Sequence, residues 1–134
     1  MRIVLDTNVL ISALLFGGRP RIILEKVVRR ELTLCISEPI LAELAGVLQR
    51  PKFGFGATAV NQIVAELSAI SELIRPSQEF AVIGADQADN RVIECAVEAN
   101  AEYIISGDMH LLALKEYGSI QVVSPQAFLE RHMS

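Results

Sequence analysis

Residues 2–8 read Arg2-Ile3-Val4-Leu5-Asp6-Thr7-Asn8, and this stretch decides the fold. The three consecutive aliphatic residues after Arg2 predict a short strand that is buried on both faces, as in a sheet covered by helices on each side. Asp6 ends that strand. A carboxylate at the end of a buried strand is costly to desolvate unless it is hydrogen-bonded, paired or bound to a metal. Asp6 is therefore the first candidate functional residue.

The rest of the chain alternates predicted strands with predicted helices. Further strands are expected at residues 33–36, 103–106 and 120–123, with a weaker signal at residues 80–82. The helices expected around them cover residues 9–16, 19–31, 38–49, 59–73, 89–100 and 109–114, and a last helix begins at Pro125. This order predicts a three-layer α/β/α fold whose central sheet has four to five mostly parallel strands. The length fits one domain spanning residues 1–134.

The composition is typical of a globular protein from a reducing compartment. The apolar fraction is 51%, Trp is absent and aromatic residues make up 5%, so we expect an aliphatic core. Cys35 and Cys95 both lie in apolar runs, which predicts two buried thiols rather than a disulfide and favours a cytoplasmic location. No apolar run approaches the ~20 residues of a membrane span, so no membrane association is expected.

Charge is unevenly distributed along the chain, whose net charge is −4. Residues 19–52 hold seven basic and four acidic side chains, whereas residues 79–116 hold two basic and eight acidic ones. A basic segment can contact a phosphate backbone, and an acidic segment can bind metal ions. The basic candidates for such a contact are Arg19, Arg21, Arg50 and Lys52. The alternative is that these charges belong to ordinary solvated helix faces.

Acidic residues follow several of the predicted strands. Asp6 and Asp108 come after two of them, and ligands in open α/β sheets bind beyond the carboxyl ends of the strands. Glu43 lies on the helix after the second strand, while Asp86 and Asp89 lie near a predicted helix start. Simpler roles exist for three of these residues. Asp89 and Asp108 each fit a helix N-cap, and Glu43 fits a partly exposed helix position.

Acids that converge on one site would repel one another and raise their own pKa values. A hard divalent cation such as Mg²⁺ or Mn²⁺ prefers oxygen ligands and removes that repulsion. Zinc is not expected, because His110 and His132 are isolated and the two cysteines lie in apolar runs. A carboxylate site with one or two such ions is typical of enzymes that transfer or hydrolyse phosphoryl groups.

Four short motifs follow one another along the chain, and each falls at the end or start of a predicted element. They are Ile3-Val4-Leu5-Asp6-Thr7-Asn8, Ser37-Glu38-Pro39-Ile40-Leu41-Ala42-Glu43-Leu44, Asp89-Asn90 and Ile104-Ile105-Ser106-Gly107-Asp108, with Arg50-Pro51-Lys52-Phe53 after the second. In this order they resemble the PIN domain family, over essentially the whole chain. The resemblance is greatest to VapC-like toxins of bacterial and archaeal toxin–antitoxin pairs.

The resemblance implies a metal-dependent endoribonuclease with an acidic quartet and one or two Mg²⁺ or Mn²⁺ ions. Carried over by position, the catalytic and metal-binding quartet is Asp6, Glu43, Asp89 and Asp108. The polar residues that would orient these ligands and water are Thr7, Asn8, Asn90 and Ser106. Such a site hydrolyses the RNA phosphodiester with water and leaves a 5′-phosphate and a 3′-hydroxyl. It needs neither a 2′-hydroxyl nucleophile nor a histidine base.

The sequence departs from the family around the third acid. The family pattern there is often Asp-Pro-Asp-Asp-Asn, whereas this chain reads Asp86-Gln87-Ala88-Asp89-Asn90. Asp89 is preferred as the ligand because it adjoins Asn90 at the helix start, and Asp86 is the alternative. Ser106 stands where Thr is commoner in the family and keeps the hydroxyl.

The resemblance also implies partners and leaves two other functions open. A toxin of this kind cleaves RNA, is silenced by an antitoxin protein and often forms a homodimer. The first alternative is an inactive PIN module that binds RNA or a protein, which the altered Gln87-Ala88 segment favours. The second is a phosphatase of the haloacid dehalogenase type, although Asn8 stands where that class needs a second Asp.

Overall fold

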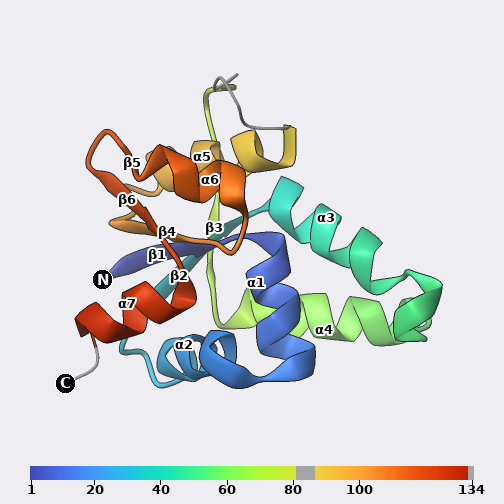
Figure 1. Ribbon diagram of the computed structural model, residues 1–134. Coiled ribbons are helices and arrows are strands. Elements are labelled where there is room, and N and C mark those ends of the chain that lie inside the picture. Colours follow the sequence, from blue (N-terminus) through green and yellow to red (C-terminus); the bar gives the residue numbers. More distant parts are fainter. Residues whose placement is uncertain (81–86, 133–134) are drawn as a thin grey trace.

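A six-stranded sheet forms the centre of the protein in the computed structural model, which describes residues 1–80 and 87–132 (Figure 1). The strands are β1 (Arg2–Leu5), β2 (Thr33–Ser37), β3 (Glu72–Ile74), β4 (Tyr103–Ile105), β5 (Glu116–Tyr117) and β6 (Ile120–Val123). Their order in the sheet is β3-β2-β1-β4-β6-β5, and all neighbours are parallel except the pair β5–β6. The predicted α/β class with a mostly parallel sheet is confirmed.

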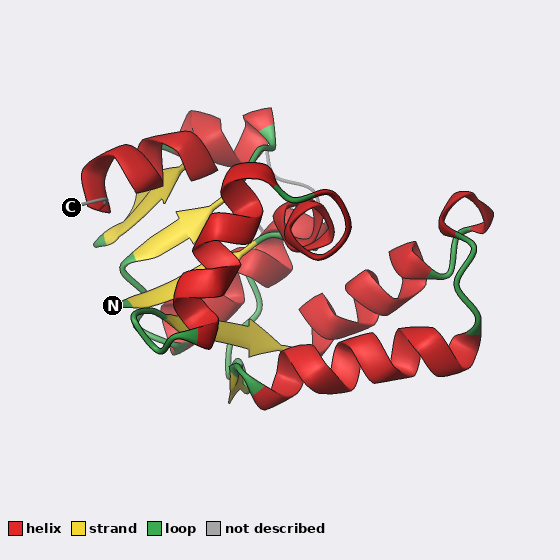
Figure 2. Ribbon diagram, turned by 90° about the horizontal axis from the view of Figure 1, so that it is seen from below, coloured by secondary structure: helices red, strands yellow, loops and turns green. Residues whose placement is uncertain are grey.

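Helices cover both faces of this sheet. They are α1 (Thr7–Ile11), the π-helix η1 (Ser12–Phe16), α2 (Gly18–Val28), α3 (Glu38–Leu48), the 3₁₀ turn η2 (Pro51–Phe53), α4 (Ala57–Ala69), α5 (Gln87–Glu98), α6 (Met109–Leu114) and α7 (Pro125–His132). Figure 1 shows α5 and α6 above the sheet, with α1, α2, α4 and α7 below it. The view from below shows α3 and α4 running side by side (Figure 2).

Several predicted boundaries are wrong. The sheet has six strands in the described residues rather than four to five, because the short edge strands β3 and β5 carry little local signal. The helix expected over residues 59–73 ends at Ala69, and Leu73 pairs with Ile36 of β2 instead. The apolar spacing of Ile70 and Leu73 continues a helical period, but pairing with a distant strand prevails over it. Most of the strand expected at residues 80–82 lies outside the described residues.

Two further helix boundaries also differ. The helix expected over residues 19–31 ends at Val28, where Arg30 takes a left-handed φ of 64°. The expected helix over residues 9–16 starts two residues earlier, at Thr7, and changes to a π-helix at Ser12. Asp6 occupies the N-cap of that helix, so the strand and the helix share a single residue as their connection. This direct connection fixes the direction of the Asp6 side chain.

The core is aliphatic, as the composition predicts. Its largest fully buried side chains come mainly from β1, β2 and the helices packed on them. Phe128 of α7 is a fully buried aromatic ring and packs edge-on against Tyr103. Cys35 and Cys95 are both buried and free, which confirms the prediction of two thiols. Among the described helices, none has the length and apolarity needed to cross a bilayer.

Candidate active site at the carboxyl edge of the sheet

A small polar pocket lies beyond the carboxyl ends of β1 and β4, the two central strands. These strands pair in register through Leu5 and Ile105, so the residues that follow them, Asp6 and Ser106, become neighbours. The pocket has a volume of about 80 Å³. The side chains that line it are Asp6, Thr7, Asn8, Glu43, Ala88, Asp89, Val92 and Asp108. The fold thus brings together acids from four separate segments of the chain.

Asp6 is buried and is held by two hydrogen bonds. It is 6% exposed, and its Oδ1 accepts a hydrogen bond of 2.8 Å from the backbone N–H of Val9 in the first turn of α1. The hydroxyl of Ser106 donates to Oδ2. Burial raises the pKa of Asp6 above its ordinary value, against the lowering effect of Ser106 and Val9, and the nearby charges of Asp108 and Glu43 raise it further.

Glu43 reaches the pocket from α3, which packs against α1. Its side chain is half-buried, and the Thr7 hydroxyl donates a hydrogen bond of 3.0 Å to Oε2. Thr7 directly follows Asp6 at the start of α1, so two adjacent residues of the chain contribute Asp6 to the pocket and a hydrogen bond to Glu43. This bond holds the Glu43 carboxylate beside the start of α1.

Asp108 lies at the N-terminus of α6, where it serves as the helix N-cap. Its Oδ1 accepts hydrogen bonds from the backbone N–H groups of His110, at 2.7 Å, and Leu111, at 3.1 Å. The backbone N–H of Asp108 itself donates to the Ser106 hydroxyl at 2.9 Å. Ser106 therefore links Asp108 to Asp6 through one buried hydroxyl. Neither of the capping bonds uses Oδ2 of Asp108, and the residue lines the pocket.

Asp89 lies in the first turn of α5 and is 7% exposed. The expectation that Asp89 caps this helix is wrong, because α5 already includes Gln87 and Ala88. Asn90 is also buried but does not line the pocket. Asp86, the alternative third ligand, lies outside the described residues. Ala88, from the segment that departs from the family pattern, lines the pocket beside Asp89, as does Val92, which no sequence motif marks.

The donor set of the pocket suits a hard divalent cation. Four carboxylates line it, and no His or Cys is among its lining residues in the described part of the chain. As the side chains stand, no three described Asp, Glu, His or Cys residues converge closely enough to hold one ion. Mutual repulsion keeps like charges apart, and a divalent cation would offset it. The oxygen donors that line the pocket are of the kind that Mg²⁺ or Mn²⁺ prefers.

The four basic candidates separate into two groups. Arg21 donates to the backbone carbonyls of Ala13, at 3.0 Å, and Leu14, at 3.2 Å. Its guanidinium is therefore used to bind carbonyl groups of η1. Arg19 is exposed on α2 outside the acidic pocket. Arg50 and Lys52 instead line a groove next to the acidic pocket. Only this second pair is placed by the fold beside the carboxylates.

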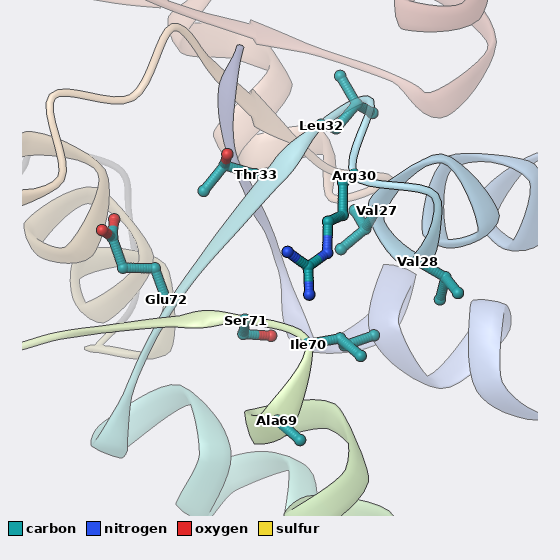
Figure 3. A pocket seen from close by; sticks show the side chains of 9 residues that line it. All are labelled: Val27, Val28, Arg30, Leu32, Thr33, Ala69, Ile70, Ser71 and Glu72. Atoms are coloured by element: carbon teal, nitrogen blue, oxygen red, sulfur yellow. The ribbon is translucent and has the colours of Figure 1, made fainter.

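Another pocket lies at the opposite edge of the sheet, where β2 and β3 begin (Figure 3). Its volume is about 370 Å³, and Figure 3 shows the Arg30 guanidinium directed toward the segment that carries Ile70 and Ser71. It contains one acid, Glu72, whose carboxylate pairs with Arg2. This pocket offers no group of carboxylates, so the carboxyl edge of the sheet is the better candidate for a metal site.

Comparisons with known proteins agree with this architecture. Solved structures with a similar fold include VapBC2 from Rickettsia felis bound to a DNA fragment from its promoter (TM-score 0.64, 14% identity, 91% of this chain and 97% of that chain). They also include VapBC-1 from nontypeable Haemophilus influenzae (TM-score 0.62, 19% identity, 94% of this chain and 99% of that chain). At these identities the likeness shows the fold.

Sequence relationships are more specific. Uncharacterized protein MJ1680 of Methanocaldococcus jannaschii is 30% identical over 142 residues, which cover 97% of this chain and 90% of that protein. The family model described as PIN domain matches residues 2–110, a range that includes every acid of the described pocket. The chain therefore belongs to the PIN domain family.

Proposed function

We propose that the protein is an endoribonuclease that hydrolyses RNA phosphodiester bonds with one or two Mg²⁺ or Mn²⁺ ions. The observation that carries this proposal is the buried Asp6, held by Ser106 and Val9 in a pocket lined by three further acids. Membership of the PIN domain family supports a nuclease function. Asp6, Glu43, Asp89 and Asp108 would hold the metal, with Asp86 as the alternative to Asp89.

The chain's own residues have distinct tasks in this proposal. Asp6 is fixed by two hydrogen bonds, so its carboxylate does not need to be ordered when a ligand arrives. Thr7 orients Glu43, and Ser106 connects Asp6 with the backbone of Asp108. A bound divalent ion would supply Lewis-acid stabilisation of the phosphodiester and a more acidic water. Asn8 lines the pocket and offers an amide to the substrate or to water.

The same pocket supports hydrolysis by water rather than attack by the 2′-hydroxyl. His110 is exposed on α6, and His132 packs against Tyr103 with its Nε2 3.0 Å from the Tyr103 hydroxyl. Neither histidine lines the acidic pocket, so no imidazole base is available there from the described residues. The expected products carry a 5′-phosphate and a 3′-hydroxyl.

We also propose that the protein acts as a toxin. The structural neighbours are VapBC proteins, which supports a VapC-like toxin that acts in the cytoplasm and pairs with an antitoxin. A homodimer and a single domain over residues 1–134 belong to the same proposal. Copurification with the product of a neighbouring gene, and loss of RNA cleavage in that complex, would test the pairing.

One observation favours the alternative of an inactive PIN module. The Ala88 methyl group lines the pocket directly before Asp89, where the family pattern often has an acid. Fewer carboxylates would weaken metal binding, and the domain would then act by binding RNA or a protein. The phosphatase alternative gains no support, because the amide of Asn8 lines the pocket where that class needs a carboxylate.

The test is cleavage of a 5′-labelled single-stranded RNA by purified protein with Mn²⁺, with EDTA, and with the variant Asp6→Asn. Asn can still accept the Val9 hydrogen bond, so the fold should persist while cleavage falls by at least about 100-fold, the upper range for changes around metal ligands. Glu116→Gln, at an exposed position on β5, is the matched control and should cleave normally.

Two outcomes would overturn the nuclease proposal. The first is cleavage that persists in EDTA, and the second is undiminished cleavage by Asp6→Asn. Products that end in a 2′,3′-cyclic phosphate would exclude hydrolysis by water. Calorimetry with Mn²⁺ separates the alternatives, since an inactive module should show neither metal binding nor cleavage.

A further inference from the structure

The pocket at the opposite edge of the sheet (Figure 3) has no part in the proposed nuclease chemistry. It forms where the chain leaves α2 to enter β2 and leaves α4 to enter β3, two strands that pair in parallel. Its volume of about 370 Å³ lies in the range of small-molecule sites. The two pockets lie at opposite ends of the strands and share no lining residue among those described, so this one needs an explanation of its own.

Arg30 is the basic residue among the described residues that line this pocket, and its backbone conformation is unusual for an arginine. Its φ is 64°, at the position directly after the C-cap of α2, where glycine is the usual residue. Any side chain in this conformation destabilises the folded chain relative to glycine. Figure 3 shows what the arginine adds, a guanidinium directed across the pocket toward the segment that carries Ile70 and Ser71.

The Arg30 guanidinium forms neither an ion pair nor a hydrogen bond with any residue that the structure describes. Carbonyl groups at the end of α4 are the nearest kind of partner, but they are already occupied. The Ser71 hydroxyl donates to the Leu67 carbonyl at 2.7 Å, and the Ser71 N–H donates to the Ser68 carbonyl at 3.2 Å. Glu72, the acid of the pocket, pairs with Arg2 instead. Arg30 therefore places an unneutralised positive charge in the pocket.

The walls of the pocket are mainly aliphatic. The end of α2 and the segment after it supply one wall, and the end of α4 with the residue after it supplies the other; the apolar residues are Val27, Val28, Leu32, Ala69 and Ile70. Val28 is 59% exposed and Ile70 is 38% exposed. Thr33 lines the same pocket and offers a hydroxyl. The pocket thus combines a cation and a hydroxyl with apolar surface that a ligand could cover.

We propose that this pocket binds a small organic anion, whose carboxylate or phosphate group pairs with Arg30 and whose aliphatic body contacts the apolar walls. A guanidinium is planar and can donate two parallel hydrogen bonds to either kind of headgroup. An inorganic ion would leave the apolar walls in water, whereas an organic body removes that surface from water. This site is separate from the proposed nuclease function and does not depend on it.

The test is titration of isotope-labelled protein with hexanoate, hexyl phosphate, hexanol and hexylamine, followed through the amide NMR spectrum. The probes share an alkyl chain and differ in the headgroup. Hexanoate, hexyl phosphate or both should shift the Arg30 and Ser71 amide signals saturably, and the tighter of the two identifies the headgroup. Hexanol should bind about 10- to 100-fold more weakly, because it cannot form charge-assisted hydrogen bonds. Hexylamine should not bind.

Two variants of Arg30 separate ligand binding from a structural role. Arg30→Gln should weaken binding of the preferred anion by about 10- to 100-fold. Arg30→Gly should lose binding to a similar extent and raise the melting temperature, since glycine adopts the left-handed conformation without strain. Arg29→Gln is the matched control, because Arg29 is exposed beside Arg30 and does not line the pocket.

Four results would overturn the proposal. They are equal binding of hexanol and the anions, binding of hexylamine in preference to the anions, unchanged anion affinity in Arg30→Gln, and no saturable shift with either anion. A lower melting temperature in Arg30→Gly would show that the guanidinium holds the fold together, and this result too would contradict the proposed role. None of these measurements involves RNA cleavage, so their outcome is independent of the nuclease proposal.

Discussion

Asp6 has a structural role as well as its proposed catalytic one. It caps α1 through Val9 and accepts the Ser106 hydroxyl, so it connects β1, α1 and the end of β4. Because burial raises its pKa, ionisation of Asp6 opposes folding. With the pKa raised in the folded state, this contribution reduces stability as pH rises above the unfolded value of about 3.9. A cation that binds the carboxylate would offset that cost.

The pKa of Glu94 is shifted in the opposite direction to that of Asp6, and this shift leads to a prediction about the pH dependence of stability. It is 4% exposed, and Arg91 forms two hydrogen bonds of 2.6 Å to its carboxylate while the Phe80 N–H donates at 2.7 Å. Burial would raise the pKa of Glu94, but the bonds from Arg91 and Phe80 outweigh it and lower the pKa. Its stabilisation is therefore present above the unfolded pKa of about 4.3 and lost as pH falls through the folded value.

We expect Glu94→Gln to lower the free energy of unfolding by about 1–3 kcal/mol at pH 7, the range for hydrogen bonds to charged groups. The difference from the wild type should shrink as the pH falls below about 4. Urea denaturation across this pH range measures both quantities. Glu116→Gln at its exposed position serves as the control, and a deficit for Glu94→Gln that stays constant with pH would contradict the explanation.

The elements around the site show where local signals are sufficient and where they are not. Residues 9–16 carry helical periodicity, and the structure does form helical turns there. The change to a π-helix at Ser12 has no counterpart in the periodicity. In the structure this segment packs against α2, and Arg21 donates to the Ala13 carbonyl. Phe16, the last residue of this π-helix, is 71% exposed.

Gly17, at the end of the π-helix, and Gly46, inside α3, should respond in opposite ways to substitution by alanine. Gly17 has a φ of 91°, and a Cβ atom there would meet only the Arg21 side chain at ordinary contact distance, so the cost of a side chain is backbone strain. We expect Gly17→Ala to lower the free energy of unfolding by about 1–3 kcal/mol. Gly46 lies inside α3 with open space around it, and Gly46→Ala should instead stabilise the protein by about 0.5–1 kcal/mol.

Thermal and urea unfolding of the two alanine variants measure this difference in sign. Loss of stability in both variants would mean that space near the backbone, rather than φ, controls the cost. Equal gains would mean that the turn at Gly17 is not constrained.

At the scale of the whole molecule, the two thiols report on global unfolding. Cys35 and Cys95 are fully buried, and burial raises their pKa values to about 11 and about 12. The thiolate is the reactive form, so both should resist Ellman's reagent at pH 8 in the native protein. Both should react in concentrated urea. Fast reaction of either thiol without denaturant would show that β2 or α5 opens locally.

The chain order also explains how distant acids come to share a pocket. The sheet grows from β1 to β2 and β3 on one side, then returns to β4 and β6 on the other. The central position of β1 places Asp6 between α3, which carries Glu43, and the end of β4, which precedes Asp108. Ligands bind where the direction of the connections reverses in such sheets, and the acidic pocket lies there.

The sequence by itself determined the alternation of strands and helices, the aliphatic core and the family, because these depend on local apolar patterns and short motifs. Asp6 stood out for the same reason, as a carboxylate directly after a buried strand. Only the tertiary structure decided the edge strands β3 and β5, the hydroxyl shared by Asp6 and Asp108, and the pocket that Arg30 lines. These features arise from pairing and packing between residues far apart in the chain, and local patterns carry no record of such contacts.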